Sequence, residues 1–115
     1  MSQKRLSTIA AKRQTPASVF AALGDETRLA LVAKLAGGQP RSISQLTKGS
    51  KLTRQAISKH LRVLKTVGMV QSVRTGRENR FEFNPQPIAG IKEYLDFVSE
   101  QWDEALSRLK SFVEM

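Results

Sequence analysis

Four cations within twelve residues are the first feature of this chain that could do chemistry. Arg54, Lys59, Arg62 and Lys65 lie in a stretch, residues 52–70, that contains no acidic residue. A helix that only packs against a core usually carries both signs of charge on its solvent side, whereas guanidinium and ammonium groups without counter-charges bind phosphates. The stretch is therefore expected to contact a polyanion.

The residues between these cations indicate a helix with two different faces. Ile57, Leu61 and Leu64 recur at i, i+4 and i+7, the spacing of one apolar stripe on a helix. Thr53 is suited to cap the N-terminus of this helix, and Gly68 to end it. The stripe would pack in a core and leave a polar set on the other side: Arg54, Gln55, Ser58, Lys59, Arg62 and Lys65.

Three further helices are expected before this one. Ser42 can cap a short helix, "ISQLTK", and the pair of short helices with a few residues between them is the helix-turn-helix pattern. Pro16 begins "ASVFAALG", and Asp25 can cap "ETRLALVAKLAGG"; both segments are expected to be scaffold. The apolar stripe expected on the second scaffold helix is Leu29, Val32, Leu35 and Ala36.

The hydrophobic period changes from helical to alternating after Gly68. "MVQSV" and "RFEFN" are typical of strands, and the Gly-containing turn "RTGREN" between them carries Arg74, Arg77 and Arg80 in or beside it. A basic hairpin directly after a helix-turn-helix pair indicates the wing of a winged helix, over residues 70–84. The predicted fold is mainly α with a small β hairpin.

A long amphipathic helix is predicted over about 87–113. Its apolar residues are separated alternately by three and four positions, the spacing of a coiled-coil seam. The seam is Ile88, Ile91, Leu95, Val98, Trp102, Ala105, Leu109 and Phe112. Such a helix would be about 40 Å long, more than so small a domain can cover. We therefore expect a dimer interface at Leu95, Val98, Trp102, Ala105, Leu109 and Phe112.

Composition limits the remaining possibilities. The 115 residues carry a net charge of +9, are 40% hydrophobic and include no cysteine, which excludes disulfides, thiolate metal sites and cysteine nucleophiles. Residues 1–14 are expected to be a flexible basic arm, and residues 15–115 a single domain. Neither a signal peptide nor a membrane-spanning run is recognisable, so a cytoplasmic, nucleoid-associated protein is expected.

Taken together, these segments resemble the ArsR/SmtB-type bacterial winged-helix repressors over residues 17–113. The resemblance rests on "ALGDETRLALVAKL", on "ISQLTKGSKLTRQAISKHLRVLKTVGMV" as the reading unit and on "VRTGRENRFEFN" as the wing. It implies a homodimer, joined through its terminal helices, that places recognition helices 53–66 in successive major grooves of an inverted repeat. Repression is likewise implied by the resemblance alone.

The resemblance also assigns roles to individual residues. Arg54, Gln55, Ser58 and Lys59 would face base edges, where Gln can pair with adenine and Arg with guanine. Arg62 and Lys65 would lie towards the phosphate backbone, and Arg74 and Arg77 would approach the minor groove or phosphates. The full DNA-binding set expected is Ser44, Thr53, Arg54, Gln55, Ser58, Lys59, Arg62, Lys65, Arg74 and Arg77.

The metal-sensing motifs of the family are missing from this chain. Ser42-Ile43-Ser44 stands where thiolate sensors carry Cys-x-Cys, and Asn84-Pro85-Gln86-Pro87 stands where others carry Asp-x-His. His60 is the single histidine, so its expected role is packing or a phosphate contact. No metal site, cofactor or enzymatic activity is therefore expected.

Other interpretations of the same residues remain open. A nucleoid-type or RNA-binding winged helix without sequence preference would also need the basic face. A ligand or metal switch could use a site without a recognisable motif; Trp102 could line a small-molecule pocket, and the carboxylates of the last helix could hold a hard cation. A solvated acidic face and packing of Trp102 at the dimer contact are the simpler explanations.

Overall fold

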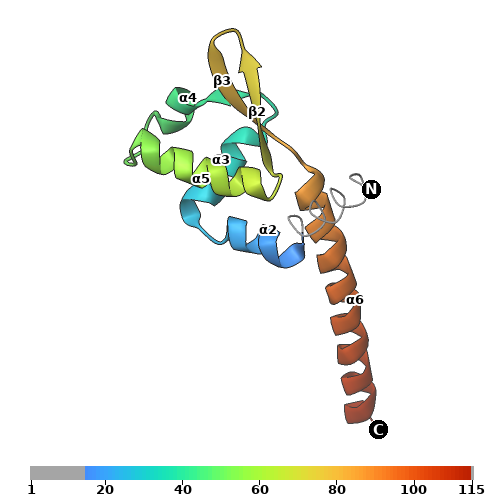
Figure 1. Ribbon diagram of the computed structural model, residues 1–115. Helices are drawn as coiled ribbons and strands as arrows, with labels where there is room; N and C mark the ends of the chain where they lie inside the picture. The colour runs from blue at the N-terminus through green and yellow to red at the C-terminus, as the bar shows by residue number, and fades with distance from the viewer. Residues whose placement is uncertain (1–14, 115) are drawn as a thin grey trace, which may run out of the picture.

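The computed structural model describes residues 15–114, which form a helical body, a small sheet and one projecting helix (Figure 1). In chain order the elements are α2 (Pro16–Leu23), α3 (Glu26–Leu35), β1 (Arg41–Ser42), α4 (Ile43–Thr47), α5 (Arg54–Thr66), β2 (Val70–Thr75), β3 (Glu78–Phe83) and α6 (Gln86–Glu114). The basic arm expected at residues 1–14 lies outside the described residues.

Short polar side chains begin the helices of the body, as predicted. The side chains of Asp25, Ser42 and Thr53 each accept a hydrogen bond from the backbone N–H three residues later, at 3.0, 3.2 and 3.1 Å. Gln45 completes a capping box, because its side chain accepts from the backbone N–H of Ser42 at 2.8 Å. The three predicted caps are therefore confirmed.

The sheet has three antiparallel strands in the order β1-β3-β2, one more than the predicted hairpin. Arg41 pairs with Phe81 and Ser42 with Arg80, so the chain before α4 adds a short edge strand to the wing. The hairpin is also longer than predicted, since its strands reach Thr75 and begin again at Glu78. Gly76 has a φ of 63° in the two-residue turn, a conformation that suits glycine and the twist of a hairpin.

The core lies where α2, α3, α4 and α5 meet the base of the sheet. Its largest fully buried side chains are Leu35, Leu46, Ile57, Leu61, Leu64, Met69, Val19 and Val70. The stripe predicted for α3 was partly wrong: Leu29 is 51% exposed, whereas Leu31 is buried. The body therefore buries the apolar face predicted for α5, and on α3 it buries Leu35 and partly buries Val32 of the predicted stripe, together with Leu31 in place of Leu29.

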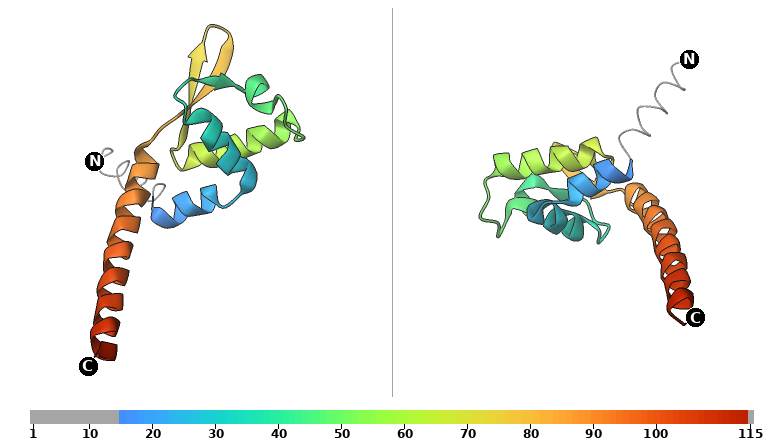
Figure 2. Two further views of the ribbon diagram at one scale, coloured as in Figure 1. Left: turned by 180° about the vertical axis from the view of Figure 1, so that it is seen from behind. Right: turned by 90° about the horizontal axis from the view of Figure 1, so that it is seen from below.

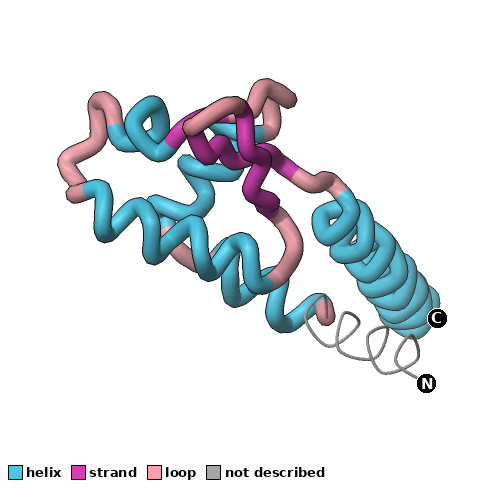
Figure 3. Tube along the Cα trace, turned by 45° about the horizontal axis from the view of Figure 1, so that its top comes forward, coloured by secondary structure: helices cyan, strands magenta, loops and turns pink. Residues whose placement is uncertain are grey.

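Helix α6 follows β3, packs its first turns against α2 and then projects away from the body (Figures 2 and 3). Of its 29 residues only Pro87 and Ile91 are buried. The radius of gyration is 18.7 Å, compared with about 13 Å for a compact domain of this length. The long C-terminal helix predicted from the apolar seam is present, and most of that seam is exposed in a single chain.

Candidate nucleic-acid interface

Helix α5 places the predicted polar set on its exposed side. Ile57, Leu61 and Leu64 are at most 1% exposed and fix the orientation of the helix against the body. The cations and Gln55 face solvent on the other side, and Ser58 is half-buried beside them. Because the buried stripe fixes which way the helix faces, the polar side chains form one continuous surface along α5: Arg54, Gln55, Ser58, Lys59, Arg62 and Lys65.

The N-terminal end of α5 adds to the positive potential of this surface. The first amides of a helix carry partial positive charge, and no acidic residue occurs in the first turn of α5. The Thr53 hydroxyl oxygen accepts the amide of Ala56, so this predicted site residue also caps the helix. Ser44 is exposed on α4, the neighbouring helix of the pair.

The C-terminal end of α5 is linked to the wing. Lys65 Nζ donates a hydrogen bond of 3.1 Å to Ser72 Oγ on β2. An open pocket of about 210 Å³ lies at this junction, lined by Ser58, Leu61, Arg62, Lys65, Ser72 and Phe81. Two cations and two hydroxyls around one pocket can bind a phosphate. Ser72 was not predicted as a site residue, because a single serine within a predicted strand has no local pattern that points to Lys65 on the preceding helix.

The three arginines of the wing are not equivalent. Arg80 forms an ion pair with Glu78, Nε to Oε2 at 3.1 Å, which offsets its charge locally. Arg74 Nε donates to the backbone oxygen of Gly76 at 3.4 Å, and Arg77 occupies the turn itself. The ion-pairing pattern therefore leaves Arg74 and Arg77, the two predicted for DNA contact, as the wing cations without a carboxylate partner among residues 15–114.

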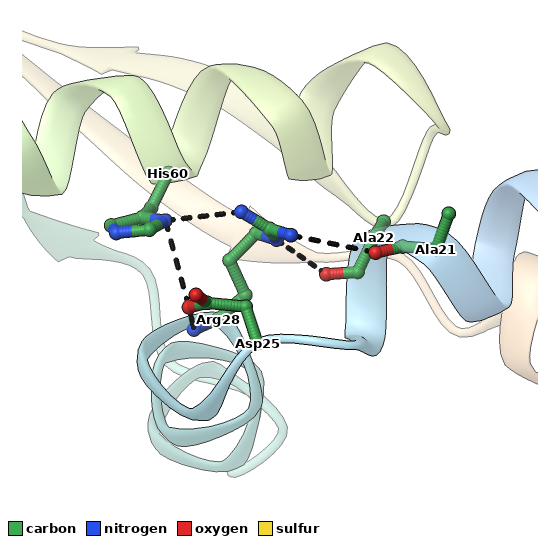
Figure 4. A network of polar contacts seen from close by, with 5 residues as sticks. All are labelled: Ala21, Ala22, Asp25, Arg28 and His60. Carbon is green, nitrogen blue, oxygen red and sulfur yellow. Dashed lines mark hydrogen bonds and ion pairs between the residues drawn. The ribbon is translucent and has the colours of Figure 1, made fainter.

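His60 lies on the side of α5 that faces the scaffold, away from the polar surface (Figure 4). Its Nδ1 is 3.2 Å from Arg28 Nη1 and 3.7 Å from Asp25 Oδ2. Of the two roles expected for His60, the structure supports packing within the fold. The amide of Arg28 hydrogen-bonds the Asp25 carboxylate and lowers its pKa, and the nearby side chains of His60 and Arg28 lower it further by electrostatic attraction, against an opposing effect of burial.

The predicted dimer-interface residues form an exposed apolar surface along α6. Leu95, Trp102, Leu109 and Phe112 are exposed, with Trp102 at 63%, and Val98 and Ala105 are half-buried. An open hollow of about 310 Å³ beside Trp102 is lined by Gln101, Trp102 and Ala105. A ligand in so open a site would remain largely solvated, so packing at an interface remains the simpler role for Trp102.

Neither a metal cluster nor a membrane-spanning helix is found within residues 15–114. Among residues 15–114, no group of three or more His, Asp or Glu side chains is arranged to hold a metal ion. No helix within that range is long and apolar enough to cross a membrane.

Comparison with known proteins identifies relatives over most of the chain. Residues 25–72 match the family described as bacterial regulatory protein, arsR family. The HTH-type transcriptional regulator Rv2034 of Mycobacterium tuberculosis is 31% identical over 101 residues, which cover 88% of this chain and 91% of that protein.

Solved structures agree with the sequence relatives. An ArsR-like transcriptional regulator from Rhodococcus sp. RHA1 is 38% identical and superposes with a TM-score of 0.74 over 84% of this chain and 91% of that one. The homodimeric winged helix-turn-helix DNA-binding domain of Mb0332 from Mycobacterium bovis shares the fold at 24% identity, with a TM-score of 0.58 over 74% of this chain and 78% of that one. Rv2034 and the Rhodococcus protein are described as transcriptional regulators, which is a non-enzymatic function.

The winged helix-turn-helix fold described above thus agrees with the relatives found by sequence and by structure. The chain belongs to the ArsR family of winged helix-turn-helix transcriptional regulators, and its winged helix is a DNA-binding domain.

Proposed function

We propose that this regulator is a homodimeric repressor that binds an inverted repeat in double-stranded DNA, in the cytoplasm. The observation that carries the proposal is the division of α5 into a buried face and a cationic face. Ile57, Leu61 and Leu64 are buried in their own chain. The opposite face of α5 therefore does not take part in the core and is accessible to a ligand. Its charge and its hydrogen-bonding groups suit DNA.

Base reading is assigned to the N-terminal half of α5. Arg54, Gln55, Ser58 and Lys59 lie in the first two turns, the part of a recognition helix that reaches base edges in the major groove. Gln55 can pair with adenine and Arg54 with guanine, each pair contributing about 1–3 kcal/mol of discrimination.

Phosphate binding is assigned to the residues around this reading surface. Arg62 and Lys65 line the pocket shared with Ser72, where a phosphate oxygen can be held by charge and hydroxyl groups together. Arg74 and Arg77 on the wing would contact the flanking minor groove or backbone. The hydroxyls of Ser44 and Thr53 can donate to phosphates on the opposite flank.

Dimerisation is assigned to α6, whose apolar surface is left exposed by the other elements within residues 15–114. A second copy would bury the seam on both chains at once, as a two-fold interface requires. The homodimeric state of Mb0332, which has the same fold, supports this assignment. A dimer seated on an operator would repress by occupying the DNA that polymerase needs.

The decisive experiment is selection of duplex DNA by the purified protein at about 150 mM salt, a physiological ionic strength. We expect an inverted repeat whose half-sites are centred about 10–10.5 base pairs apart. Tight binding without any recovered motif would contradict the proposal and favour a non-specific nucleoid or RNA-binding protein. Run-off transcription from a promoter that contains the recovered site then tests repression, which should reduce the transcript.

Salt dependence tests the electrostatic assignments separately. If a dimer neutralises roughly six phosphates, affinity for the operator should fall about a thousandfold between 50 and 200 mM salt. A nearly flat response would show that the cations of α5 and the wing do not contact the backbone.

A further inference from the structure

Arg28 joins three helices through one guanidinium group (Figure 4). Its Nε donates to the backbone oxygen of Ala22 at 2.5 Å and its Nη2 to that of Ala21 at 3.4 Å, both in the last turn of α2. Its Nη1 lies 3.2 Å from Nδ1 of His60 on α5. Because a guanidinium has donors only, a hydrogen bond between these two atoms requires His60 Nδ1 to be the acceptor.

Helix α2, to which Arg28 is hydrogen-bonded, packs against α6, the helix with the proposed dimer surface. The Phe20 and Tyr94 rings of α2 and α6 meet edge to face, with centroids 6.3 Å apart. Arg28 donates to two carbonyl oxygens at the C-terminus of α2, where positive charge is favourable; the Ala21 oxygen also accepts the Gly24 amide at 3.2 Å. Helices α2 and α6 therefore form one unit, and Arg28 connects it to the recognition helix.

A second connection between α6 and α5 lies at the other end of the recognition helix. The backbone N–H of Asn84, directly before α6, donates to the Met69 oxygen at 2.8 Å, and Asn84 Nδ2 donates to the Gly68 oxygen at 2.9 Å. Gly68 follows the last turn of α5, about 12 Å along the axis from His60 at 1.5 Å per residue. Either connection alone would let α5 rotate relative to the α2–α6 unit. The two connections together fix the angle between them.

We propose that Arg28 is a positioning residue for DNA reading: through His60 it sets the angle of α5 relative to the α2–α6 unit. That angle determines which half-site separation the dimer binds best. The inference rests on the dimer and the inverted repeat proposed above, and it adds a residue that does not contact DNA to the determinants of operator choice.

Helix α5 is long enough that a small rotation about its C-terminal end displaces the reading residues at its N-terminal end. Gln55 lies about 20 Å along α5 from Gly68, so a rotation of roughly 5° about that end moves the reading residues by about 1.7 Å. Two-fold symmetry can double the change in separation to about 3.4 Å, which is the rise of one base pair. A guanidinium bound at three acceptors resists such a rotation, whereas a lysine ammonium cannot reproduce its planar fork.

The test measures binding of the full-length dimer to a series of inverted repeats and to a duplex with a single half-site. The half-site separation is varied by single base pairs around one helical turn. The wild-type protein is expected to prefer one separation by at least about tenfold over its neighbours, comparable to the cost of one mismatched base pair. Arg28→Lys should leave the half-site affinity within about twofold and reduce the preference to about threefold or less.

Two His60 variants test the same connection from α5. His60→Gln keeps an acceptor for Arg28 and should retain the spacing preference, whereas His60→Leu removes the acceptor and should flatten it. His60→Leu also covers the case in which Arg28→Lys does not fold. Leu46→Val, a change at a fully buried residue of α4 outside the network, is the control for a general loss of stability and should keep the peak.

The outcomes separate this inference from the function on which it rests. A peaked wild-type profile that Arg28→Lys and His60→Leu leave unchanged overturns the positioning role alone. An equal loss of affinity for the half-site and for every separation shows a purely structural role and also overturns it. A flat wild-type profile removes the proposed inverted-repeat function, and the inference with it.

Discussion

Helices α5 and α6 differ in how far their apolar side chains are buried. In α5 the stripe of Ile57, Leu61 and Leu64 is buried almost completely by the same chain. In α6 the corresponding stripe continues for more than five turns beyond Ile91, and its large side chains, including Trp102 and Phe112, remain exposed. Both helices are amphipathic, but only α5 completes its packing within one chain.

The difference shows how each helix can be used. Since the fold already covers the apolar face of α5, its polar face is oriented before any ligand binds and can act as a rigid reading surface. Helix α6 has an exposed apolar surface, which in soluble proteins marks an interaction site. In one chain the polar face of α5, proposed to bind DNA, is thus fully formed, whereas the apolar face of α6, proposed for assembly, is left exposed.

Breaking the assembly surface should have the largest effect. Trp102→Glu would place a charge in the seam and should convert dimers to monomers in sedimentation, with a loss of about 10²–10⁴-fold in affinity for an inverted repeat because the two half-sites are no longer linked. Glu100→Gln, on the same helix outside the seam, should remain dimeric. An unchanged dimer in Trp102→Glu would show that the interface lies elsewhere.

Truncation of a leucine should lower the free energy of unfolding by different amounts in the two helices. Leu61→Ala removes a fully buried side chain and should lower the free energy of unfolding by about 2–5 kcal/mol in urea denaturation. Leu109→Ala, made in the monomeric Trp102→Glu background, should change it by no more than about 0.5 kcal/mol because the side chain is already exposed. Equal losses would mean that α6 packs on its own chain.

Base reading by α5 should appear as a loss of specificity. Gln55→Ala should weaken binding to the selected operator by about 1–3 kcal/mol and leave random duplex DNA nearly unaffected. Gln39→Ala, in the exposed loop before β1, is the control and should change neither affinity. If operator and random DNA lose affinity equally, Gln55 does not read a base.

The wing should contribute charge without sequence preference. Arg77→Ala should weaken specific and random DNA by the same factor, and it should reduce the slope of log affinity against log salt by about 1 for each phosphate that is no longer neutralised. Lys110→Ala makes the same change of charge on α6 and should leave the slope unchanged. A loss confined to the operator would instead make Arg77 a base-reading residue.

The smallest effect is expected at the start of α3. Asp25→Asn keeps an N-cap but removes the charge that the folded protein favours, so it should be slightly less stable than the wild type at pH 7. Because the pKa of Asp25 is lowered on folding from 3.8, this advantage is present above that pH and is lost as the pH falls through the folded value. Urea midpoints of the two proteins should therefore converge in acid, and a constant difference would assign the effect to the cap alone.

Local signals in the sequence were sufficient for the helices of the body. Asp25, Ser42 and Thr53 were identified as caps because a capping side chain acts within three residues of itself. The apolar period of α5 was equally clear, so the exposed side of its polar residues could be predicted. The contacts of these residues with DNA stay predictions.

Features that depend on distant partners were not recognisable from the sequence. The two residues of β1 have no strand pattern of their own and become a strand only by pairing with β3. The choice of Leu31 over Leu29 on α3 depends on where α5 lies. Arg28 and His60 are 32 residues apart, and neither has a local pattern that points to the other.

The exposed seam of α6 has a consequence for how the regulator responds to its own abundance. If the dimer is the form that occupies the operator, then at concentrations well below the dimer dissociation constant, doubling the total protein gives about four times as many dimers. A repressor of this kind would switch its target over a narrower range of expression level than a monomer could. The length and strength of one apolar stripe would thus set the threshold of a genetic switch.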